Sequence, residues 1–397
     1  MTTDDTLSAA PQQNKTHWSG VWAMTLCVFT LIASEFMPVS LLSPLSQDLR
    51  VSEGLAGQGI AISGALAVIT SLSITRLAGH LNRKILLLTL TLLMALSGLI
   101  VALAPDYLTY MAGRALTGVV IGGFWSMSAA VAIRLVPAEQ VPRALAIFNG
   151  GNALATVIAA PLSSYLGAVT GWRGAVFSLV PVALIALLWQ AIALPSMPVD
   201  RARPRRQSLL QLLRAPRVRS GLAACGLLFM GQFTLFTYLR PFLETVTQIE
   251  VSTLSLVLLT LGASGFIGTV IVGAVLQRGF YFTLMTIPLV MAAVAVLLIL
   301  SGHHLWWVAP LLAIWGLVAT AAPAGWWAWV ARAFPDNAEA GGGLMVAIVQ
   351  LSIAAGSTLG GIAFDHAGWQ TTFALSAVLL ILAAGLVTIT ARLAHMT

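Results

Sequence analysis

Two side chains of opposite charge stand out because each lies inside a long apolar run. Glu35 is the one charged residue in the stretch LIASEFMPVSLL, and Arg114 is the one basic residue well inside another such run. A charged group at the centre of a membrane helix costs about 3 kcal/mol, whereas a leucine is favourable there. Charges kept in such places are functional by default, so we begin with the chemistry that these two residues offer.

The two charges are expected to lie at the same depth and to pair. Each lies about eight residues from the same end of its run, which at ~1.5 Å per residue places both roughly 12 Å below one surface. Burial favours the protonated form of Glu35, and a nearby guanidinium favours the carboxylate. Glu35 is therefore predicted to take up and release a proton as its surroundings change. A static ion pair that only fixes helix packing is the alternative.

The composition places these charges in a membrane protein. Of the 397 residues, 58% are hydrophobic and 8% are charged, with a mean hydropathy of +0.93. Ordinary soluble domains carry about 25% charged residues, and a chain this apolar needs lipid as its solvent. Residues 1–17 are polar and lack the features of a secretory signal, so the first apolar run is expected to remain as a span. Cys27 and Cys225 lie in apolar runs and are interpreted as small core residues.

The predicted fold is an all-α membrane protein with twelve transmembrane helices in two pseudo-symmetric six-helix bundles. A span of ~30 Å of hydrocarbon needs about 20 mainly apolar residues. Such segments occur near 18–43, 55–76, 85–104, 107–134, 143–167, 174–194, 220–243, 252–276, 282–301, 305–332, 342–364 and 370–391. The predicted parts are a cytoplasmic tail (1–17), an N-terminal bundle (18–194), a basic linker (195–219) and a C-terminal bundle (220–392).

The basic residues predict the orientation. With the N-terminus inside, sixteen of the 20 Lys and Arg residues fall on the cytoplasmic side, which gives an N-in, C-in topology. The arginine-rich linker is interpreted as a topogenic loop near anionic headgroups rather than a nucleic-acid site.

An internal repeat relates the two bundles at an offset of about 198 residues. The segment RLVPAE (134–139) corresponds to RAFPDN (332–337), and Gly118 corresponds to Gly316. Parallel duplication of six spans is the plan of two-domain transporters. In that plan the binding site lies between the halves near the midplane, and the halves rock around it.

Several motifs resemble those of the major facilitator superfamily over almost the whole chain. The stretches SEFMPVSLLSPLSQDLRVSEGLAGQ, GGFWSMSAAVAIRLVP and FTYLRP are similar to the sugar and nucleoside efflux group of the twelve-span drug:H+ antiporter branch. Within that group the chain looks closest to bacterial purine ribonucleoside efflux pumps. The resemblance implies a multi-pass carrier in the bacterial inner membrane that works by alternating access.

The resemblance also implies gating residues and identifies Arg114 as the buried arginine of a family motif. The motif TRLAGHLNRK contains Arg83 and Lys84 but has Gly79 where the family has aspartate, and GRALTG contains Arg114. The span-5 stretch AAPLSSYLG has Ala160 before Pro161 where Gly-Pro is usual. Arg83, Lys84 and Pro161 are the gating residues that the resemblance implies.

Aromatic and amide side chains within the predicted spans are candidates for binding substrate. Indole rings can stack on a flat base, and amides or hydroxyls can bond its edges or a ribose. Tryptophans at membrane interfaces and amides that only join helices, at ~0.6 kcal/mol each, are the alternative interpretation. The candidate substrate-binding residues are Trp125, Ser126, Asn149, Asn152, Gln232, Tyr238, Trp326 and Gln350.

The predicted function is transport rather than catalysis. The six His residues fall in loops or tails, and no nucleophile–base or metal-ligand spacing occurs, so we expect no enzyme, metal or cofactor beyond a proton gradient. We expect a monomer in lipid that binds protons and a small substrate and no nucleic acid. The favoured cargo is purine ribonucleosides, exported against protons. Arabinose-type sugars or drugs by the same mechanism, a uniporter or uptake symporter, and a channel or receptor are the alternatives.

Overall fold

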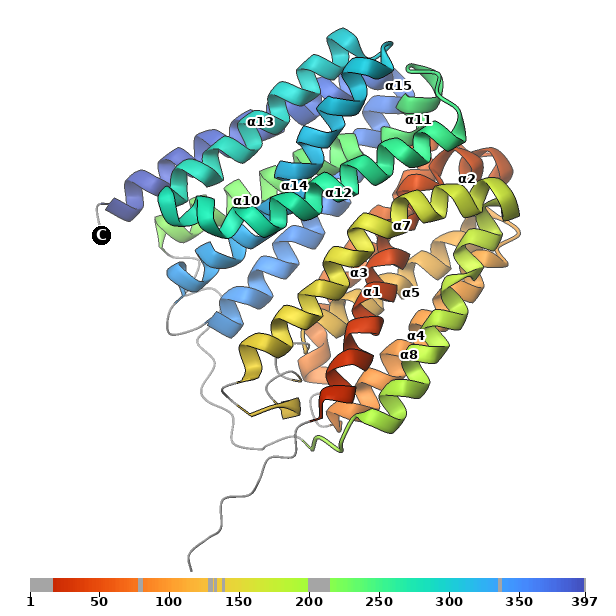
Figure 1. Ribbon diagram of the computed structural model, residues 1–397, viewed down its shortest axis with the longest axis vertical. Helices are drawn as coiled ribbons and strands as arrows, with labels where there is room; N and C mark the ends of the chain where they lie inside the picture. Colours follow the sequence, from red (N-terminus) through yellow and green to blue (C-terminus); the bar gives the residue numbers. More distant parts are fainter. Residues whose placement is uncertain are drawn as a thin grey trace, which may run out of the picture.

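The computed structural model is all-helical in the part of the chain it describes. That part comprises residues 17–77, 81–127, 131, 134–137, 140–198, 215–334 and 338–395, and it contains no strand. Two helical bundles lie side by side (Figure 1), the first in red to yellow-green and the second in green to blue. This all-helical architecture agrees with the predicted fold class.

The N-terminal half contains seven helices among these residues. They are α1 (Trp18–Ser40), α2 (Leu42–Leu49), α3 (Glu53–Leu77), α4 (Arg83–Ala102), α5 (Tyr107–Trp125), α7 (Val141–Phe177) and α8 (Leu179–Ala193). Its core is built above all from apolar side chains of α1 and α4, with two or three residues each from α3, α5, α7 and α8.

The C-terminal half contains six helices in the described residues. They are α10 (Pro216–Phe236), α11 (Leu239–Thr245), α12 (Val251–Arg278), α13 (Phe280–Ser301), α14 (Leu305–Ala333) and α15 (Ala338–His395). Helix α10 begins with Pro216 in its first turn, where proline costs no hydrogen bond, four residues before the boundary predicted from the sequence.

Nine helical ranges in the described residues are long and apolar enough to cross a membrane. The ranges Gly150–Ala193 and Gly341–Ala394 are 44 and 54 residues long, about twice what one crossing needs. Each contains one glycine with positive φ, Gly171 (75°) or Gly368 (81°), where the chain leaves helical geometry. Only glycine adopts this backbone region at no steric cost, so these two residues allow the chain to reverse.

The two halves repeat the same close helix contact. A Cβ on Gly118 of α5 would overlap the carbonyl oxygen of Ser63 in α3, and a Cβ on Gly316 of α14 would overlap that of Leu261 in α12. Both glycines therefore let two backbones meet where any larger side chain would separate them. The paired positions lie at the offset of about 198 residues that relates the two halves in the sequence.

Helix α1 ends five residues after Glu35, at Ser40. Pro38 lies inside its last turn and offers no backbone N–H, and the N–H of Leu41 bonds the carbonyl of Pro38 at 3.3 Å before α2 begins. The break turns the chain into α2, which lies close to α11 at one end of the molecule (Figure 1). We call this the α2–α11 end.

Candidate functional site

The carboxyl group of Glu35 is buried at the junction between the two halves. Its residue is 4% exposed, and no other acidic residue is buried in the described part of the chain. The amide Nε2 of Gln350, from α15 of the other half, donates to the Glu35 Oε1 at 3.2 Å. Gln350 is 6% exposed, and its own Oε1 has no hydrogen-bond partner. The site thus brings together a predicted proton carrier and a predicted substrate residue.

Arg114 of α5 lies next to Glu35 but binds its backbone. The guanidinium is 2% exposed and donates to three carbonyl oxygens, those of Ser34 (2.8 Å), Glu35 (3.1 Å) and Gly59 (3.0 Å). The expected ion pair between the two side chains is corrected here: they form no salt bridge. The Ser34 carbonyl lacks its helical donor because residue 38 is proline, and it accepts from the guanidinium instead.

This arrangement leaves the Glu35 carboxyl without a direct ion-pair partner. The carboxyl accepts one amide hydrogen bond and feels the Arg114 charge at a distance, whereas a direct ion pair would hold it ionised. Arg114 satisfies the backbone of α1 and α3 and so fixes where the carboxyl lies. The geometry therefore suits a group that gains and loses a proton.

A small cavity of about 30 Å³ lies beside Arg114 inside the N-terminal half. Its polar lining includes Thr30, Ser34, Ser97 and Thr117, the last two joined by a hydrogen bond of 2.6 Å. A cavity needs a volume of roughly 10–15 Å³ to hold a water molecule, so this cavity is large enough for one.

The two halves are also joined by polar contacts at the α2–α11 end. The carboxylate of Asp365 in α15 accepts hydrogen bonds from the Ser52 hydroxyl and from the Gly54 N–H (3.0 Å), at the start of α3. A carboxylate is favourable at a helix N-terminus, where backbone N–H groups lack partners. Two turns further, the Thr358 hydroxyl donates to the Gln58 Oε1 at 3.0 Å.

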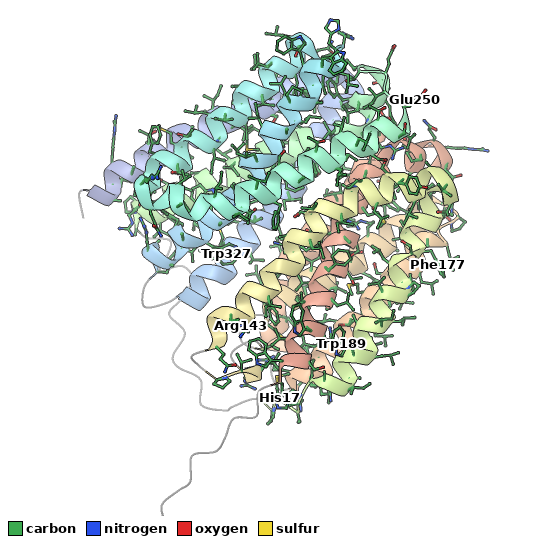
Figure 2. All side chains as sticks on the ribbon, in the orientation of Figure 1. His17, Arg143, Phe177, Trp189, Glu250 and Trp327 are labelled. Carbon is green, nitrogen blue, oxygen red and sulfur yellow. The ribbon has the colours of Figure 1, made fainter. Side chains whose placement is uncertain are left out.

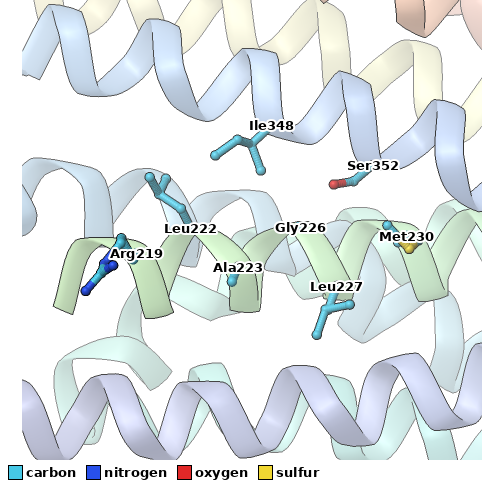
Figure 3. A pocket seen from close by; sticks show the side chains of 8 residues that line it. All are labelled: Arg219, Leu222, Ala223, Gly226, Leu227, Met230, Ile348 and Ser352. Atoms are coloured by element: carbon cyan, nitrogen blue, oxygen red, sulfur yellow. The ribbon is translucent and has the colours of Figure 1, made fainter. Parts of the chain in front are cut away.

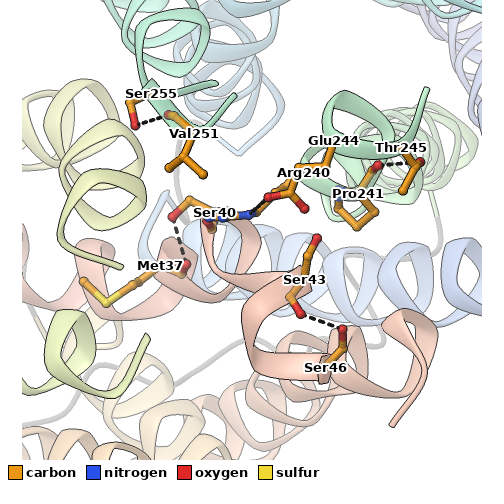
Figure 4. Close-up of polar contacts among 10 residues, drawn as sticks. All are labelled: Met37, Ser40, Ser43, Ser46, Arg240, Pro241, Glu244, Thr245, Val251 and Ser255. Atoms are coloured by element: carbon orange, nitrogen blue, oxygen red, sulfur yellow. Dashed lines mark hydrogen bonds and ion pairs between the residues drawn. The ribbon is translucent and has the colours of Figure 1, made fainter. Parts of the chain in front are cut away.

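Arg240 of α11 adds a further contact at this end (Figure 4). Its guanidinium donates to the carbonyl oxygen of Ser40, the last residue of α1, and to the Glu244 carboxylate at 2.7 Å. The same residue thus joins the end of α1 in one half to α11 in the other.

Aromatic rings fill the space between these polar contacts. The Tyr238 hydroxyl donates to the Ser357 carbonyl at 2.7 Å, and its ring stacks on Phe364 at 5.3 Å. A Cβ on Gly57 of α3 would overlap the Tyr238 hydroxyl, so the two halves are in close contact here. Nearer to Glu35, the rings of Phe36 and Phe233 stack across the junction at 5.5 Å.

The predicted substrate residues do not all come together. Tyr238 is fully buried in the contact just described, and Gln350 lies against Glu35. Trp326 is 2% exposed inside the core of the C-terminal half and packs edge-on against Trp329 at 5.7 Å. Neighbouring Trp327 lies on the surface of α14 instead (Figure 2).

The remaining substrate candidates lie on three helices. Trp125 and Ser126 are half-buried at the end of α5, where the Ser126 hydroxyl bonds the Gly122 carbonyl at 2.6 Å. Asn152 in α7 and Gln232 in α10 are also half-buried, and the Gln232 Oε1 has no partner. The side chain of Asn149 lies outside the described residues.

The predicted gating residues lie in the N-terminal half. Arg83 and Lys84 begin α4, where the Asn82 side chain caps the helix by accepting from the Lys84 N–H at 3.0 Å. Asn82 also accepts from the Met197 N–H at 3.0 Å, so this turn holds the chain that leaves α8. Pro161 is half-buried within α7. Their role in gating stays a prediction.

A larger hollow of about 410 Å³ lies between α10 and α15 (Figure 3). It contains none of the predicted substrate residues, and Arg219 is its one charged lining side chain. The lining residues are Arg219, Leu222, Ala223, Gly226, Leu227, Met230, Ile348 and Ser352.

Sequence reasoning identified Glu35, Gln350 and Tyr238 but missed Asp365 and Ser52, which also join the halves. Asp365 and Ser52 lie 313 residues apart in the chain. Ser52 falls within the stretch SEFMPVSLLSPLSQDLRVSEGLAGQ, but nothing in that stretch marks its hydroxyl as a partner for Asp365. Their contact depends on how the two bundles sit together, which local periodicity does not encode. No group of three or more His, Cys, Asp or Glu that could hold a metal occurs among the described residues.

Comparisons with known proteins agree on the family. Residues 24–356 match the sequence pattern of the Major Facilitator Superfamily. The chain is 60% identical over 391 residues to the Transcription regulatory protein OpdE of Pseudomonas aeruginosa, covering 98% of this chain and 97% of that protein. It is 38% identical over 381 residues to the Purine ribonucleoside efflux pump NepI of Salmonella enteritidis, covering 96% of each.

Two solved structures share the fold. One is a bacterial homologue of the human lysosomal transporter Spinster in an inward-facing and unoccupied conformation, with a TM-score of 0.78, 15% identity, and coverage of 95% of this chain and 97% of that one. The other is the human organic anion transporter MFSD10, with a TM-score of 0.68, 18% identity, and coverage of 94% and 99%. Two helical halves around a buried junction, a matching sequence pattern over most of the chain and these neighbours lead to one conclusion: the chain belongs to the Major Facilitator Superfamily.

Proposed function

We propose that this protein is a proton-coupled antiporter that exports a small polar metabolite by alternating access, with purine ribonucleosides as the preferred cargo. The observation that carries the proposal is the Glu35 carboxyl, buried at the junction of the halves and bonded to the opposite half. A group so placed changes its charge and touches both moving parts. The 38% identity to a protein named as a purine ribonucleoside efflux pump supports the choice of cargo.

The proposed membrane arrangement has twelve spans with both termini in the cytoplasm of a bacterial inner membrane. The excess of Lys and Arg on one side supports this orientation. The α2–α11 end then faces outward, and its cross-half contacts correspond to a state closed to the outside. A green fluorescent protein fused to the C-terminus should fluoresce, and an alkaline phosphatase fused there should be inactive. The reverse pattern would contradict the orientation.

In the proposed cycle a proton enters at Glu35 from the outer side and leaves to the cytoplasm. Ionised Glu35 accepts the Gln350 amide in the present state, and protonation removes the charge that strengthens this bond. The free energy of proton entry thereby changes a contact between the two halves. Substrate export uses the same junction, because the cavity of a two-domain carrier lies there.

Flux into everted membrane vesicles tests the proposal. When the vesicle interior is more acidic than the medium, vesicles containing the protein should accumulate a radiolabelled purine ribonucleoside. A protonophore should abolish the accumulation. Glu35→Gln should fold and insert normally but lose gradient-driven uptake, whereas Glu35→Asp keeps an acid and should retain part of it. Gradient-driven uptake by Glu35→Gln at the wild-type rate would overturn the proposal.

The same vesicles separate the alternative cargoes. Labelled arabinose and a fluorescent multidrug substrate are offered under the same gradient. If either compound is taken up in preference to the nucleoside, that compound class is the cargo and the proposed proton mechanism still holds. Rapid, non-saturating flux would instead indicate a channel.

A regulatory function is the second candidate, because one relative at 60% identity is named a transcription regulatory protein. A membrane-embedded carrier changes transcription most simply by changing the concentration of a small effector inside the cell. We propose that any such effect follows from transport. If cells with Glu35→Gln lose the transcriptional effect, the regulation depends on transport. If a variant without transport keeps the full transcriptional effect, the protein has a separate regulatory role.

A further inference from the structure

The contact between Glu35 and Gln350 differs from every other hydrogen bond across the junction. Among the described residues, the remaining hydrogen bonds between the halves lie at the α2–α11 end and involve Ser52, Gly54, Gln58 and the Ser40 carbonyl. The Nε2–Oε1 contact of 3.2 Å stands alone deeper in the molecule, and both of its residues are more than nine-tenths buried.

We propose that Gln350 is the residue that positions the Glu35 carboxyl for proton transfer and transmits its protonation state to the C-terminal half. This inference rests on the proposed function and deepens it. Gln350 lies on α15, which also carries Asp365 and Thr358 to the α2–α11 end. A change at Gln350 therefore acts on the same helix that closes that end.

The amide of Gln350 suits this task because it can bond both charge states of an acid. Its two N–H groups donate to a carboxylate, and its oxygen accepts from a protonated carboxyl. In the present structure Nε2 is used and Oε1 is buried without a partner. The terminal torsion of a glutamine is broad, so the amide can rotate to present its oxygen when Glu35 carries a proton.

The bond from the Gln350 amide to ionised Glu35 is stronger than its bond to protonated Glu35. This difference in strength transmits the protonation state to α15. A hydrogen bond to an ionised group is roughly twice as strong as one between neutral groups. Protonation of Glu35 thus weakens the one deep bond between α1 and α15. The unpaired Gln350 Oε1 adds to the effect. A buried acceptor without a partner costs free energy, so a state that offers it a donor is more stable.

The charged neighbours of Glu35 leave Gln350 as its direct partner. Arg114 of α5 uses its guanidinium on backbone carbonyls, and Tyr110 of α5 directs its hydroxyl to the Ala56 carbonyl at 3.4 Å. Arg240 and Glu244 of α11 bond each other next to Ser40. Helices α3, α7, α8, α10 and α15 place no other ionised side chain against this carboxyl in the described residues.

The test uses Gln350→Met, which has similar length and shape but no donor or acceptor. Everted vesicles report the pH dependence of gradient-driven uptake, and substrate exchange at equal pH on both sides reports cargo binding and movement without net proton flux. Gln350→Met should shift the pH midpoint of driven uptake upward by about one unit, equal to about 1.4 kcal/mol, because the carboxylate has lost its donor. Exchange should stay within about threefold of wild type, a change below about 0.7 kcal/mol.

Gln58→Met is the matched control, since Gln58 also bonds across the junction but to Thr358. It should leave the pH midpoint at the wild-type value. Equal shifts in both variants would show general loosening of the junction and overturn the inference, as would an unchanged midpoint in Gln350→Met. Gln350→Glu adds a second acid beside Glu35 and should move the pH midpoint further upward. A wild-type midpoint in Gln350→Glu would also contradict the inference.

The two proposals fail in different ways. If Glu35→Gln retains gradient-driven uptake, the proposed proton mechanism itself is wrong. If Glu35→Gln loses it while Gln350→Met keeps the wild-type midpoint, only the role of Gln350 is wrong. If Gln350→Met loses exchange as well as driven uptake, Gln350 binds the cargo directly, and the positioning role is replaced by the binding role predicted from the sequence.

Discussion

The junction between the two halves has two regions that are held in different ways. At the α2–α11 end, Asp365, Thr358 and Arg240 each make polar contacts across it, and Tyr238 packs between them. Deeper in the molecule a single amide–carboxyl bond joins Glu35 to Gln350. The first region tolerates the loss of one contact because the others remain. The second depends on one group whose charge can change, and this makes it the natural control point.

The largest effect is expected from Arg114, which fixes the deeper region in place. Arg114→Met removes three hydrogen bonds from a charged group, each worth about 1.5–3 kcal/mol. The Ser34 carbonyl then has no helical donor, because residue 38 is proline, whereas the Gly59 carbonyl keeps the Ser63 hydroxyl at 2.9 Å. We expect the free energy of unfolding to fall by about 3 kcal/mol or more, with loss of transport. Thermal unfolding in detergent measures the first effect and vesicle flux the second.

Arg143→Met is the control for Arg114, since Arg143 is exposed and lies over the Trp18 ring at 5.2 Å (Figure 2 labels it). Its melting temperature should stay close to the wild-type value. A stable Arg114→Met protein would show that the carbonyl contacts are dispensable.

The next largest effect tests whether the two halves are built alike. Gly118→Ala and Gly316→Ala each place a methyl group against a backbone carbonyl, and overpacking costs about 1–3 kcal/mol. The two variants should lower the melting temperature by similar amounts. A clear loss in one and none in the other would contradict structural equivalence.

Gly150→Ala and Gly273→Ala are the matched controls for these glycines. A Cβ at either position has no neighbour within 4 Å. Alanine is the better helix former by about 1 kcal/mol, so these variants should be neutral or slightly more stable.

A smaller effect is expected at the α2–α11 end. Asp365→Ala removes the partner of Ser52 and Gly54 but leaves the Arg240 and Tyr238 contacts in place. The proteins with and without Asp365→Ala both carry Thr358→Cys, which replaces the hydroxyl that bonds Gln58. In this background Asp365→Ala should make the new thiol react with a maleimide about fivefold faster, which corresponds to a loss of about 1 kcal/mol. Cys27 and Cys225 are fully buried and give little background labelling.

Glu250→Ala is the control for Asp365, because this exposed acid begins α12 at the same end without a side-chain capping bond (Figure 2). The labelling rate at position 358 should be unchanged. If Asp365→Ala also leaves it unchanged, the carboxylate does not hold the end closed.

The smallest effect concerns Asp48, an exposed acid of α2. Hydrogen bonds from Arg173 and from the Trp172 indole hold its pKa below the ordinary value of about 3.9. A depressed pKa stabilises the fold above about pH 4, and the stabilisation is lost as the pH falls further. Asp48→Asn should lower stability by less than about 1 kcal/mol at neutral pH. The difference from wild type should shrink below pH ~4, as followed by thermal unfolding against pH.

Much of the fold follows from the sequence because the determinants are local. Runs of about 20 apolar residues predict helices that lipid requires, and proline and glycine predict where they bend or reverse. Glu35 and Arg114 were identified from the cost of placing charge in hydrocarbon, and both are indeed buried side by side. The matched spacing of Gly118 and Gly316 predicted the repeat, and the structure places both at equivalent close contacts.

The remaining features depend on distances between segments that the sequence does not encode. The Glu35 carboxylate accepts from an amide rather than from Arg114. Pro38 has no N–H to offer the Ser34 carbonyl, so this carbonyl competes for the guanidinium. Trp326 was a candidate for binding substrate but packs within the C-terminal core, since helix rotation decides which face of α14 is buried.

The most direct test of the account is the number of protons moved per substrate molecule in reconstituted vesicles. Wild-type protein should release protons from acidified vesicles when substrate is added, in a fixed ratio to the substrate taken up. Glu35→Gln should exchange labelled for unlabelled substrate while moving no protons. Stoichiometric proton release by Glu35→Gln would contradict the central role of this carboxyl.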